Sequence, residues 1–185
     1  LSCLLLLFFA GCGTLHIRTG AGEFSLSPDE TAFAKALAHY AQGLICEQEF
    51  GRSSPEAMAE FCMAAELDPG QHELQARAAT ACLQNDRTED ALRILERACA
   101  ANPRSIQPWL DRGAVCQLAG QTNAAIAHYQ QVLRLDKSNT FAYLSIARLY
   151  FQKKMDKEAA RILRKGIRYG KNAQALVAYC YAQRS

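Results

Sequence analysis

The residues of this chain that could form a metal site or a catalytic site are its eight cysteines and four histidines. Thiolates and imidazoles bind zinc or act as nucleophiles and bases where several of them lie together. The sequence contains no C-x-x-C pair and no H-E-x-x-H helix, and its histidines, His16, His39, His72 and His128, are far apart. No glycine-rich phosphate loop follows a strand, and no G-x-S-x-G elbow occurs. We therefore expect no metal, no cofactor and no enzymatic activity.

One cysteine near the beginning of the chain points to a different chemistry. The apolar run from Leu4 to Ala10 is too short to span a bilayer, which takes roughly 20 residues, and has the length of a signal-peptide core. Phe9-Ala10-Gly11-Cys12 then resembles a bacterial lipobox. The resemblance implies cleavage before Cys12, a diacylglyceryl group on its sulfur and acylation of its amine with a fatty acid such as palmitate. Residues 1–11 are the expected lipoprotein signal peptide; the alternatives are an ordinary secretory signal and a short buried segment.

Lipidation of Cys12 predicts a protein that is anchored to a membrane without crossing it. Each buried methylene contributes about 0.8 kcal/mol, so several acyl chains anchor stably. Gly13 stands where an inner-membrane retention signal carries Asp, and the resemblance therefore implies the periplasmic face of the outer membrane of a diderm bacterium. Residues 12–26 show no sustained periodicity and predict a tether between the lipid and the folded part, residues 27–185.

The composition predicts an all-α domain. Of the 185 residues, 50% are hydrophobic and 21% are charged, which excludes a disordered or collagen-like chain. Alanine makes up about one residue in six whereas valine occurs three times, so helix formers outnumber strand formers. The net charge of +3 hides an asymmetry, because residues 1–100 sum to −7 and residues 101–185 to +10. This polarity bears on partners rather than on the fold.

Signals for helix starts and helix ends recur along the chain. Ser27-Pro28 and Ser54-Pro55 each place a capping serine before a proline at the first helical position, and Glu30 completes a capping box. Further helix starts are expected at Thr88, Ser105 and Thr122. Breaks between helices are expected at Gly51, Pro69-Gly70, Asn85-Asp86, Asn102-Pro103, Gly120, Lys137-Ser138-Asn139 and Gly170. Helices of about 12 to 16 residues follow from this spacing.

The sequence predicts a repeat of 34 residues that runs through the chain without insertions. Its four copies begin at Ala38, His72, Ile106 and Thr140. Position eight is Ile45, Ala79, Gly113 and Ala147; position twenty is Ala57, Ala91, Ala125 and Ala159; position twenty-four is Phe61, Leu95, Tyr129 and Leu163; position twenty-seven is Ala64, Ala98, Val132 and Gly166. Small residues at positions eight and twenty let two antiparallel helices approach closely, and the large residue at position twenty-four fills the space beside them. The alternative is a bundle of unrelated helical hairpins.

This pattern resembles the tetratricopeptide repeat family over residues 38–171. Trp109 and Tyr143 at position four, Tyr150 at position eleven, and Pro69 and Pro103 at position thirty-two agree with the family pattern. The resemblance implies a right-handed superhelical solenoid of antiparallel helix pairs, with about four repeats. Residues 172–185 are then the capping helix that covers the last interface of such an array.

The cysteines of the folded part are expected to stay unbridged and to stand in for alanine as small buried residues. They are Cys46, Cys62, Cys82, Cys99, Cys116 and Cys180. A disulfide needs Cα atoms within about 7 Å. In the repeat register, Cys46 and Cys62 are out of step by roughly 9 Å along the helix axes, and Cys82 and Cys99 by more. Cys82 and Cys116 occupy equivalent positions of neighbouring repeats, whose helices lie about 8 to 10 Å apart.

In this family the first helices of successive repeats line a concave groove, and the resemblance assigns eight residues of this chain to it. They are Phe50, Leu83, Leu110, Leu118, Phe141, Leu144, Arg148 and Phe151. Such a groove suits an amphipathic helix or an extended apolar segment of a partner protein. The Lys and Asn residues with which some family members clamp a chaperone's terminal carboxylate are missing. The alternative is that the C-terminal helix, the tether or a second copy of the chain covers the groove.

A basic face is expected on the second helix of the fourth repeat. Four cationic residues recur there at i, i+3, i+4 and i+7, namely Arg161, Arg164, Lys165 and Arg168. This face suits anionic lipid headgroups, an acidic protein or the acidic first half of a second copy, and the alternative is a solvated helix face. Nucleic acid is not an expected partner, because no stacking pattern of aromatic residues accompanies the charge.

The expected function is that of a membrane-anchored scaffold or adaptor that binds a protein or peptide partner in the cell envelope. Its architecture resembles that of the outer-membrane lipoproteins that support type IV pilus or secretin assembly. The alternative is a structural protein that assembles head to tail into homo-oligomers, acidic half to basic half.

Overall fold

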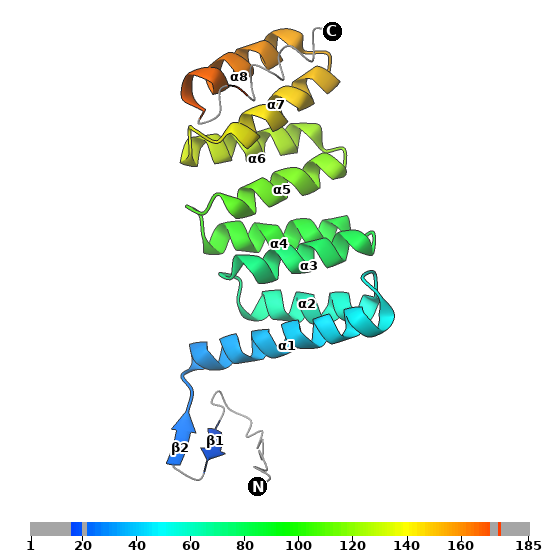
Figure 1. Ribbon diagram of the computed structural model, residues 1–185, viewed down its shortest axis with the longest axis vertical. Helices are drawn as coiled ribbons and strands as arrows, with labels where there is room; N and C mark the ends of the chain where they lie inside the picture. The colour runs from blue at the N-terminus through cyan, green and yellow to red at the C-terminus, as the bar shows by residue number, and fades with distance from the viewer. Residues whose placement is uncertain (1–15, 20–21, 171–173, 175–185) are drawn as a thin grey trace. The chain divides into compact units, whose positions relative to one another are not determined.

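The computed structural model describes residues 16–19, 22–170 and 174. Within these residues the chain forms a β-hairpin followed by eight α-helices (Figure 1). The elements are β1 (His16–Thr19), β2 (Gly22–Ser25), α1 (Pro28–Phe50), α2 (Pro55–Leu67), α3 (His72–Gln84), α4 (Thr88–Ala101), α5 (Gln107–Leu118), α6 (Thr122–Leu135), α7 (Thr140–Gln152) and α8 (Asp156–Tyr169). The chain divides into a first unit, residues 1–85, and a second unit, residues 86–185. The predicted all-α repeat fold is confirmed, and the capping helix predicted for residues 172–185 lies outside the described residues apart from Gln174.

The β-hairpin lies in the segment that the sequence predicts to be a tether. β1 and β2 pair antiparallel, with His16 opposite Ser25 and Thr19 opposite Gly22. Ile17 and Thr19 are β-branched and favour extended backbone. Strands this short do not give a recognisable alternation of polar and apolar side chains, and the sequence therefore did not predict them.

Two capping serines begin α1 and α2 as the sequence predicts. The Ser27 hydroxyl accepts a hydrogen bond from the backbone N–H of Glu30 at 3.3 Å, and the Glu30 carboxylate accepts one from the backbone N–H of Ser27 at 2.8 Å. The bond from the Ser27 backbone stabilises the ionised carboxylate and lowers the pKa of Glu30. The Ser54 hydroxyl accepts the Ala57 N–H at 2.9 Å. Both helix starts are therefore set by local hydrogen bonds.

In the first unit, α2 packs between α1 and α3. At the contact with α1, a Cβ built on Gly43 lies 2.7 Å from the buried ring of Phe61, so only glycine allows this approach. At the contact with α3, the buried Gln75 amide donates to the carbonyls of Ala65 at 2.7 Å and Asp68 at 3.0 Å. Gln75 replaces the aromatic residue that the family prefers at position four, and its amide satisfies carbonyls at the end of α2.

The predicted register of the first repeat is wrong by two residues in its first helix. The sequence places Ile45 at the close-contact position, but the Ile45 side chain is 48% exposed. The residue that faces Phe61 is Gly43, whereas Gly113 faces Tyr129 in the third repeat. Gly43 and Phe61 are thus separated by two more residues along the chain than Gly113 and Tyr129 are. The predicted period without insertions therefore does not hold in α1, which has two extra residues between this contact and α2.

A second pair of contacts supports the corrected register. In the third repeat the ring of Trp109 lies 5.9 Å from the ring of His128, centroid to centroid. In the first repeat the corresponding contact joins His39 Nδ1 and Glu60 Oε2 at 2.7 Å. Glu60 and His128 occupy the same position of their repeats, and His39 matches Trp109 only after the shift by two residues. The contact is thus retained although its chemistry differs.

In the second unit, α4 to α8 pack each against the next. A core cluster of this unit contains Tyr129, Val132, Ile146 and Leu149, all of them almost fully buried. The four alanines at position twenty of the repeats are also buried, with at most 1% of their surface exposed, in both units. They are Ala57, Ala91, Ala125 and Ala159. The prediction that all four alanines are buried packing residues is confirmed.

The turns between paired helices recur at the repeat interval from the second repeat onward. Asp86, Gly120 and Lys154 have φ values of 58°, 72° and 56°. These values lie in the left-handed region, which closes a helix and returns the chain in a short turn. After Gly120 and Lys154, the next backbone N–H bonds to the carbonyl five residues before it, Gln121 to Cys116 at 2.8 Å and Met155 to Tyr150 at 2.9 Å. The backbone therefore keeps the period even where the side chains differ.

Candidate partner-binding surfaces

Six of the predicted groove residues lie in the second unit, on α5 and α7. Leu118 and Phe141 are 76% and 53% exposed, and the Phe141 ring meets the edge of the buried Tyr129 ring at a centroid distance of 6.1 Å. The half-buried members, which pack against the core, are Leu110, Leu144 and Phe151. Arg148 is exposed. This set therefore combines apolar side chains that the core holds in place with two that remain accessible to a partner.

The other two predicted groove residues lie in the first unit. Phe50 ends α1 and is 64% exposed, and Leu83 on α3 is half-buried. The corrected register moves the family's groove positions in α1 to Leu37, Tyr40 and Leu44, and together with Phe33 these form an apolar stripe at i, i+4, i+7 and i+11. The stripe consists of Phe33, Leu37, Tyr40 and Leu44, of which all but Tyr40 are exposed. The sequence periodicity carried this signal, but the assumed period without insertions obscured it.

Two arginines link different helices within their units, and the sequence did not single them out as functional residues. The Arg77 guanidinium on α3 pairs with Glu47 on α1 and lies 4.4 Å from the centre of the Phe61 ring. In the second unit, Arg112 on α5 pairs with Glu96 on α4 at 3.1 Å. The Arg77 pair is partly buried, whereas Glu96 of the second pair is largely exposed, and each pair links two helices.

Burial shifts the pKa of several groups in the second unit. Desolvation is the largest cause for His128, whose pKa is lowered, with a further contribution from the Arg112 charge. Burial also raises the pKa of the Tyr129 and Tyr143 hydroxyls. No group of three or more His, Cys, Asp or Glu side chains within the described part of the chain is arranged to hold a metal ion.

The cysteines of the described residues form no disulfide. Burial raises the pKa of the Cys99 thiol to about 11 and also raises that of Cys116, which keeps both protonated and unreactive. Cys62 on α2 and Cys82 on α3 differ, because their Sγ atoms lie 3.5 Å apart. This pair was missed by the sequence reasoning, which compared cysteines within a helix pair or at equivalent positions. Cys180 lies outside the described residues.

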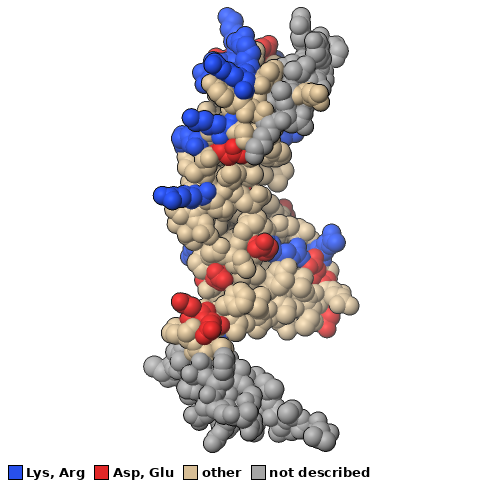
Figure 2. Space-filling view, turned by 60° about the vertical axis from the view of Figure 1, so that its left-hand side comes forward, with Lys and Arg blue, Asp and Glu red and all other residues tan. Residues whose placement is uncertain are grey.

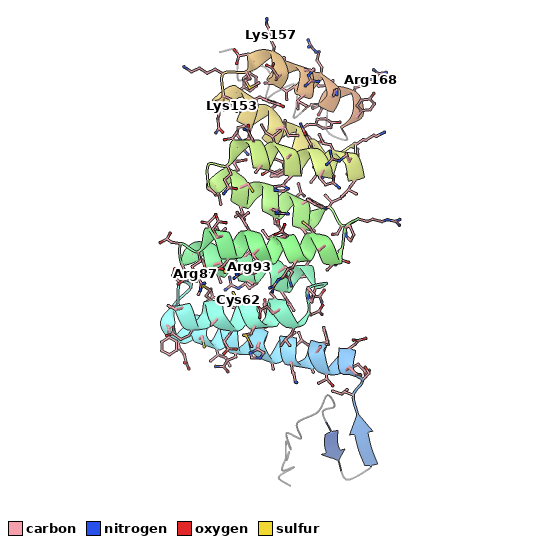
Figure 3. All side chains as sticks on the ribbon, turned by 180° about the vertical axis from the view of Figure 1, so that it is seen from behind. Cys62, Arg87, Arg93, Lys153, Lys157 and Arg168 are labelled. Carbon is pink, nitrogen blue, oxygen red and sulfur yellow. The ribbon has the colours of Figure 1, made fainter. Side chains whose placement is uncertain are left out.

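The predicted basic face lies on α8, and all four of its cations are exposed. Figure 2 shows Lys and Arg side chains gathered over the end of the second unit that holds this helix. The Arg168 guanidinium, labelled in Figure 3, stacks 5.4 Å from the centre of the Tyr169 ring. The Lys153 ammonium at the preceding turn donates to the Asn123 side chain at 2.7 Å. Lys153 thus adds a further cation of the same unit at the turn before α8.

The predicted lipidation residue, Cys12, lies outside the described residues. Among the described helices, none has the length and apolar character needed to cross a bilayer.

Two family models, both described as tetratricopeptide repeat, match the chain over residues 72–115 and 118–183. The chain is built from tetratricopeptide repeats. This agrees with the geometry, in which Gly43 meets the Phe61 ring in the first repeat and Gly113 meets the Tyr129 ring in the third. Tetratricopeptide repeat proteins are typically interaction scaffolds without catalytic activity of their own.

Solved structures of other repeat proteins share the fold. The crystal structure of MamA protein is 19% identical, covers 79% of each chain and has a TM-score of 0.61. YrrB, described as a TPR protein with an unusual peptide-binding site, is 19% identical over 84% of this chain and 78% of its own, with a TM-score of 0.60. The first TPR of Spaghetti (RPAP3), bound to the HSP90 peptide SRMEEVD, is 20% identical over 66% of this chain and 95% of its own, with a TM-score of 0.53. No curated protein sequence matches the chain.

Proposed function

We propose that this tetratricopeptide repeat protein is a scaffold or adaptor that binds a protein partner through the apolar side chains of α5 and α7. The observation that carries the proposal is the combination of half-buried Leu110 and Leu144 with exposed Leu118 and Phe141. Large apolar side chains held by a core and still open to solvent favour burial by a partner. An amphipathic helix or an extended apolar segment has the chemistry to cover them.

The solved relatives support peptide binding as the mode of interaction. YrrB is described as having a peptide-binding site, and the Spaghetti (RPAP3) repeat domain binds the HSP90 peptide SRMEEVD. That peptide ends in acidic residues, whereas the eight predicted groove residues of this chain include one cation, Arg148. The preferred partner segment of this chain is therefore apolar rather than acidic.

The test replaces the two accessible side chains and leaves the anchored ones in place. In the variant Leu118→Asp with Phe141→Asp, the immobilised protein should no longer capture its partner from solubilised envelopes. Ile167→Asp on α8 is the matched control, because Ile167 is also an exposed apolar residue of the second unit and should tolerate the charge. Equal capture by the wild type and both variants would show that the α5 and α7 side chains are not the partner site.

The proposal places the protein in the cell envelope, anchored by a lipid on Cys12 at the periplasmic face of the outer membrane, with a role in pilus or secretin assembly. Its support is the lipobox-like segment Phe9-Ala10-Gly11-Cys12. Labelling of growing cells with radioactive palmitate should mark the wild type and leave Cys12→Ser unmarked. Retention of the label in Cys12→Ser would contradict the anchor but not the partner site.

The alternative function is assembly of the chain with itself, and the charge asymmetry favours it. Residues 1–100 carry −7 and residues 101–185 carry +10, so an acidic half of one copy attracts the basic half of another. Sedimentation velocity at low and at high salt separates the two functions. Oligomers that dissociate in high salt would support self-assembly, and a monomer at both salt concentrations would exclude it.

A further inference from the structure

A cavity of about 480 Å³ opens on the second unit between α6 and α8, and its rim is strongly cationic. Arg134 and Lys137 contribute from α6 and the loop that follows it, and Arg161 and Lys165 contribute from α8. The helix-face pattern of the sequence contained only the last two. The fold therefore brings together four cations from two segments that are separate in the sequence.

In the described part of the chain, the lining of this cavity has a large excess of positive charge. None of its lining residues is acidic, and none of the four cations makes an ion pair among the described residues. Arg134 donates from Nε to the Gln131 side chain at 2.6 Å, which leaves its terminal nitrogens for another acceptor. Asp136 on the connecting loop accepts hydrogen bonds from the Ser138 backbone N–H at 2.8 Å and its hydroxyl at 2.6 Å, and its charge also acts on the Tyr143 hydroxyl.

The backbone supplies only part of the missing negative charge. Arg134 lies in the last turn of α6, whose carbonyl end carries the equivalent of about half a negative charge. Four cations around one cavity exceed that amount several-fold. The remaining repulsion favours an anionic ligand that bears more than one charge or several acceptor oxygens.

The cavity also has an apolar side. Leu133 and Ile162 line it together with the rings of Tyr143 and Tyr169. The Tyr143 hydroxyl donates to the Lys137 backbone carbonyl at 3.0 Å and so holds the loop that carries one of the cations. Arginine and lysine on one side with tyrosine and aliphatic carbon on the other suit a phosphate group attached to an organic moiety.

We propose that the cavity between α6 and α8 binds a phosphate-bearing ligand, with Arg134, Lys137, Arg161 and Lys165 around the phosphate and the tyrosine side against its organic part. The source of the phosphate is either the headgroup of a membrane lipid or a soluble phosphoester. This site is separate from the partner-binding residues of α5 and α7 and does not depend on them.

Two probes test the site and distinguish the sources. Inorganic phosphate is titrated into the protein by calorimetry, and vesicles of phosphatidylglycerol are compared with vesicles of phosphatidylcholine by co-sedimentation. Binding of phosphate in solution supports a soluble ligand, and binding of the anionic vesicles alone supports a lipid headgroup. Absence of binding to both probes overturns the proposal.

Charge-matched variants show whether the cavity itself is responsible. Arg134→Gln with Arg161→Gln should weaken binding of the effective probe at least about tenfold, because two charged hydrogen-bond donors are lost. Arg104→Gln with Lys157→Gln removes the same charge from exposed residues of the same unit outside the cavity lining and should change binding less than about twofold. Equal loss in both variants would mean attraction to the net charge and would refute a defined site.

A second, independent inference concerns the 3.5 Å contact of Cys62 and Cys82. A disulfide bond is about 2.05 Å long, so the sulfurs need to approach by about 1.5 Å. Cys82 is buried, but Cys62 is half-buried and accessible to a small oxidant. We infer that these two cysteines form a disulfide between α2 and α3 when a small-molecule disulfide is present.

The exchange with oxidised glutathione balances in two steps. The Cys62 thiolate attacks one sulfur of the oxidant, forms a mixed disulfide and releases one glutathione thiolate. The Cys82 thiolate then attacks Sγ of Cys62, forms the protein disulfide and releases the second glutathione. The protein loses two electrons and two protons, and the oxidant becomes two glutathione molecules.

Mass spectrometry tests the bridge after treatment with oxidised glutathione and alkylation of the remaining thiols. The expected result is a peptide pair linked through Cys62 and Cys82, with Cys99 alkylated after denaturation as an internal control. Cys62→Ser should abolish the link, and Cys46→Ser should retain it. Alkylation of both Cys62 and Cys82, or a glutathione that stays on Cys62, would overturn the inference.

Discussion

The close contact of Gly43 with Phe61 predicts that an alanine at position 43 destabilises the fold. A Cβ there lies 2.7 Å from Cε1 and 2.8 Å from Cδ1 of a buried ring, whereas carbon atoms pack at about 3.5 to 4.0 Å. The ring therefore has to move by about 0.8 Å within the core. Overpacking of this kind costs about 1 to 3 kcal/mol, and alanine returns about 1 kcal/mol through helix propensity. The net loss in Gly43→Ala should reach about 2 kcal/mol.

A double-mutant cycle with Phe61→Leu separates the steric cost from the helix propensity. Leucine leaves space beside position 43, so Gly43→Ala in that background should stabilise the protein by about 1 kcal/mol. The coupling between the two substitutions is then about 1 to 3 kcal/mol. Urea unfolding followed by far-ultraviolet circular dichroism measures all four proteins, and the midpoints are compared at equal slope.

Ile45→Ala is the control for the repeat register. Because Ile45 is half-exposed, its replacement should change the free energy of unfolding by no more than about 0.5 kcal/mol. A loss above about 2 kcal/mol at Ile45 would restore the register without insertions. Equal stabilisation by Gly43→Ala in the wild type and in the Phe61→Leu variant would refute the close contact.

Three further predictions follow from the turns, the buried histidine and the cysteine pair. Lys154→Gly should stabilise the protein by about 1 kcal/mol and Gly120→Ala should destabilise it by a similar amount, both measured by urea unfolding, because each φ is left-handed. Burial lowers the pKa of His128 in the folded protein. The contribution of His128 to the free energy of unfolding is therefore full above the unfolded pKa of about 6.5 and is lost as the pH falls below that value. Urea midpoints should therefore fall between about pH 7.5 and pH 5, and less so in His128→Gln; equal falls would contradict this cause. Oxidation that links Cys62 and Cys82 should add about 3 kcal/mol by closing a loop of about 20 residues, a gain absent in Cys62→Ser and reversed by reduction.

The repeat was predictable from the sequence because its signal is local. Alanine at position twenty and a large residue at position twenty-four reflect one contact between helices that are adjacent in the chain. The two extra residues in α1 were not predictable from an average period. In the sequence, the two extra residues appear as a longer interval from Gly43 to Phe61 than from Gly113 to Tyr129.

The cavity and the thiol pair were not predictable, because both join residues of different helix pairs. A helical periodicity compares residues of one helix, and it therefore identified Arg161 and Lys165 but could not associate Arg134 with them. Cys62 and Cys82 meet where α2 packs on α3, at a junction between successive repeats. The angle at which one pair follows the next decides such contacts, and a repeat pattern does not contain that angle.

The left-handed turn residues Asp86, Gly120 and Lys154 mark equivalent points of successive repeats, at a constant interval along the chain. Excision of residues 87–120 would join Asp86 directly to Gln121 and leave one backbone turn of the same hand where there were two. Duplication of the same stretch would add one turn. The array is thus modular. Recombination in the gene can add or remove a whole repeat without the need for a new loop.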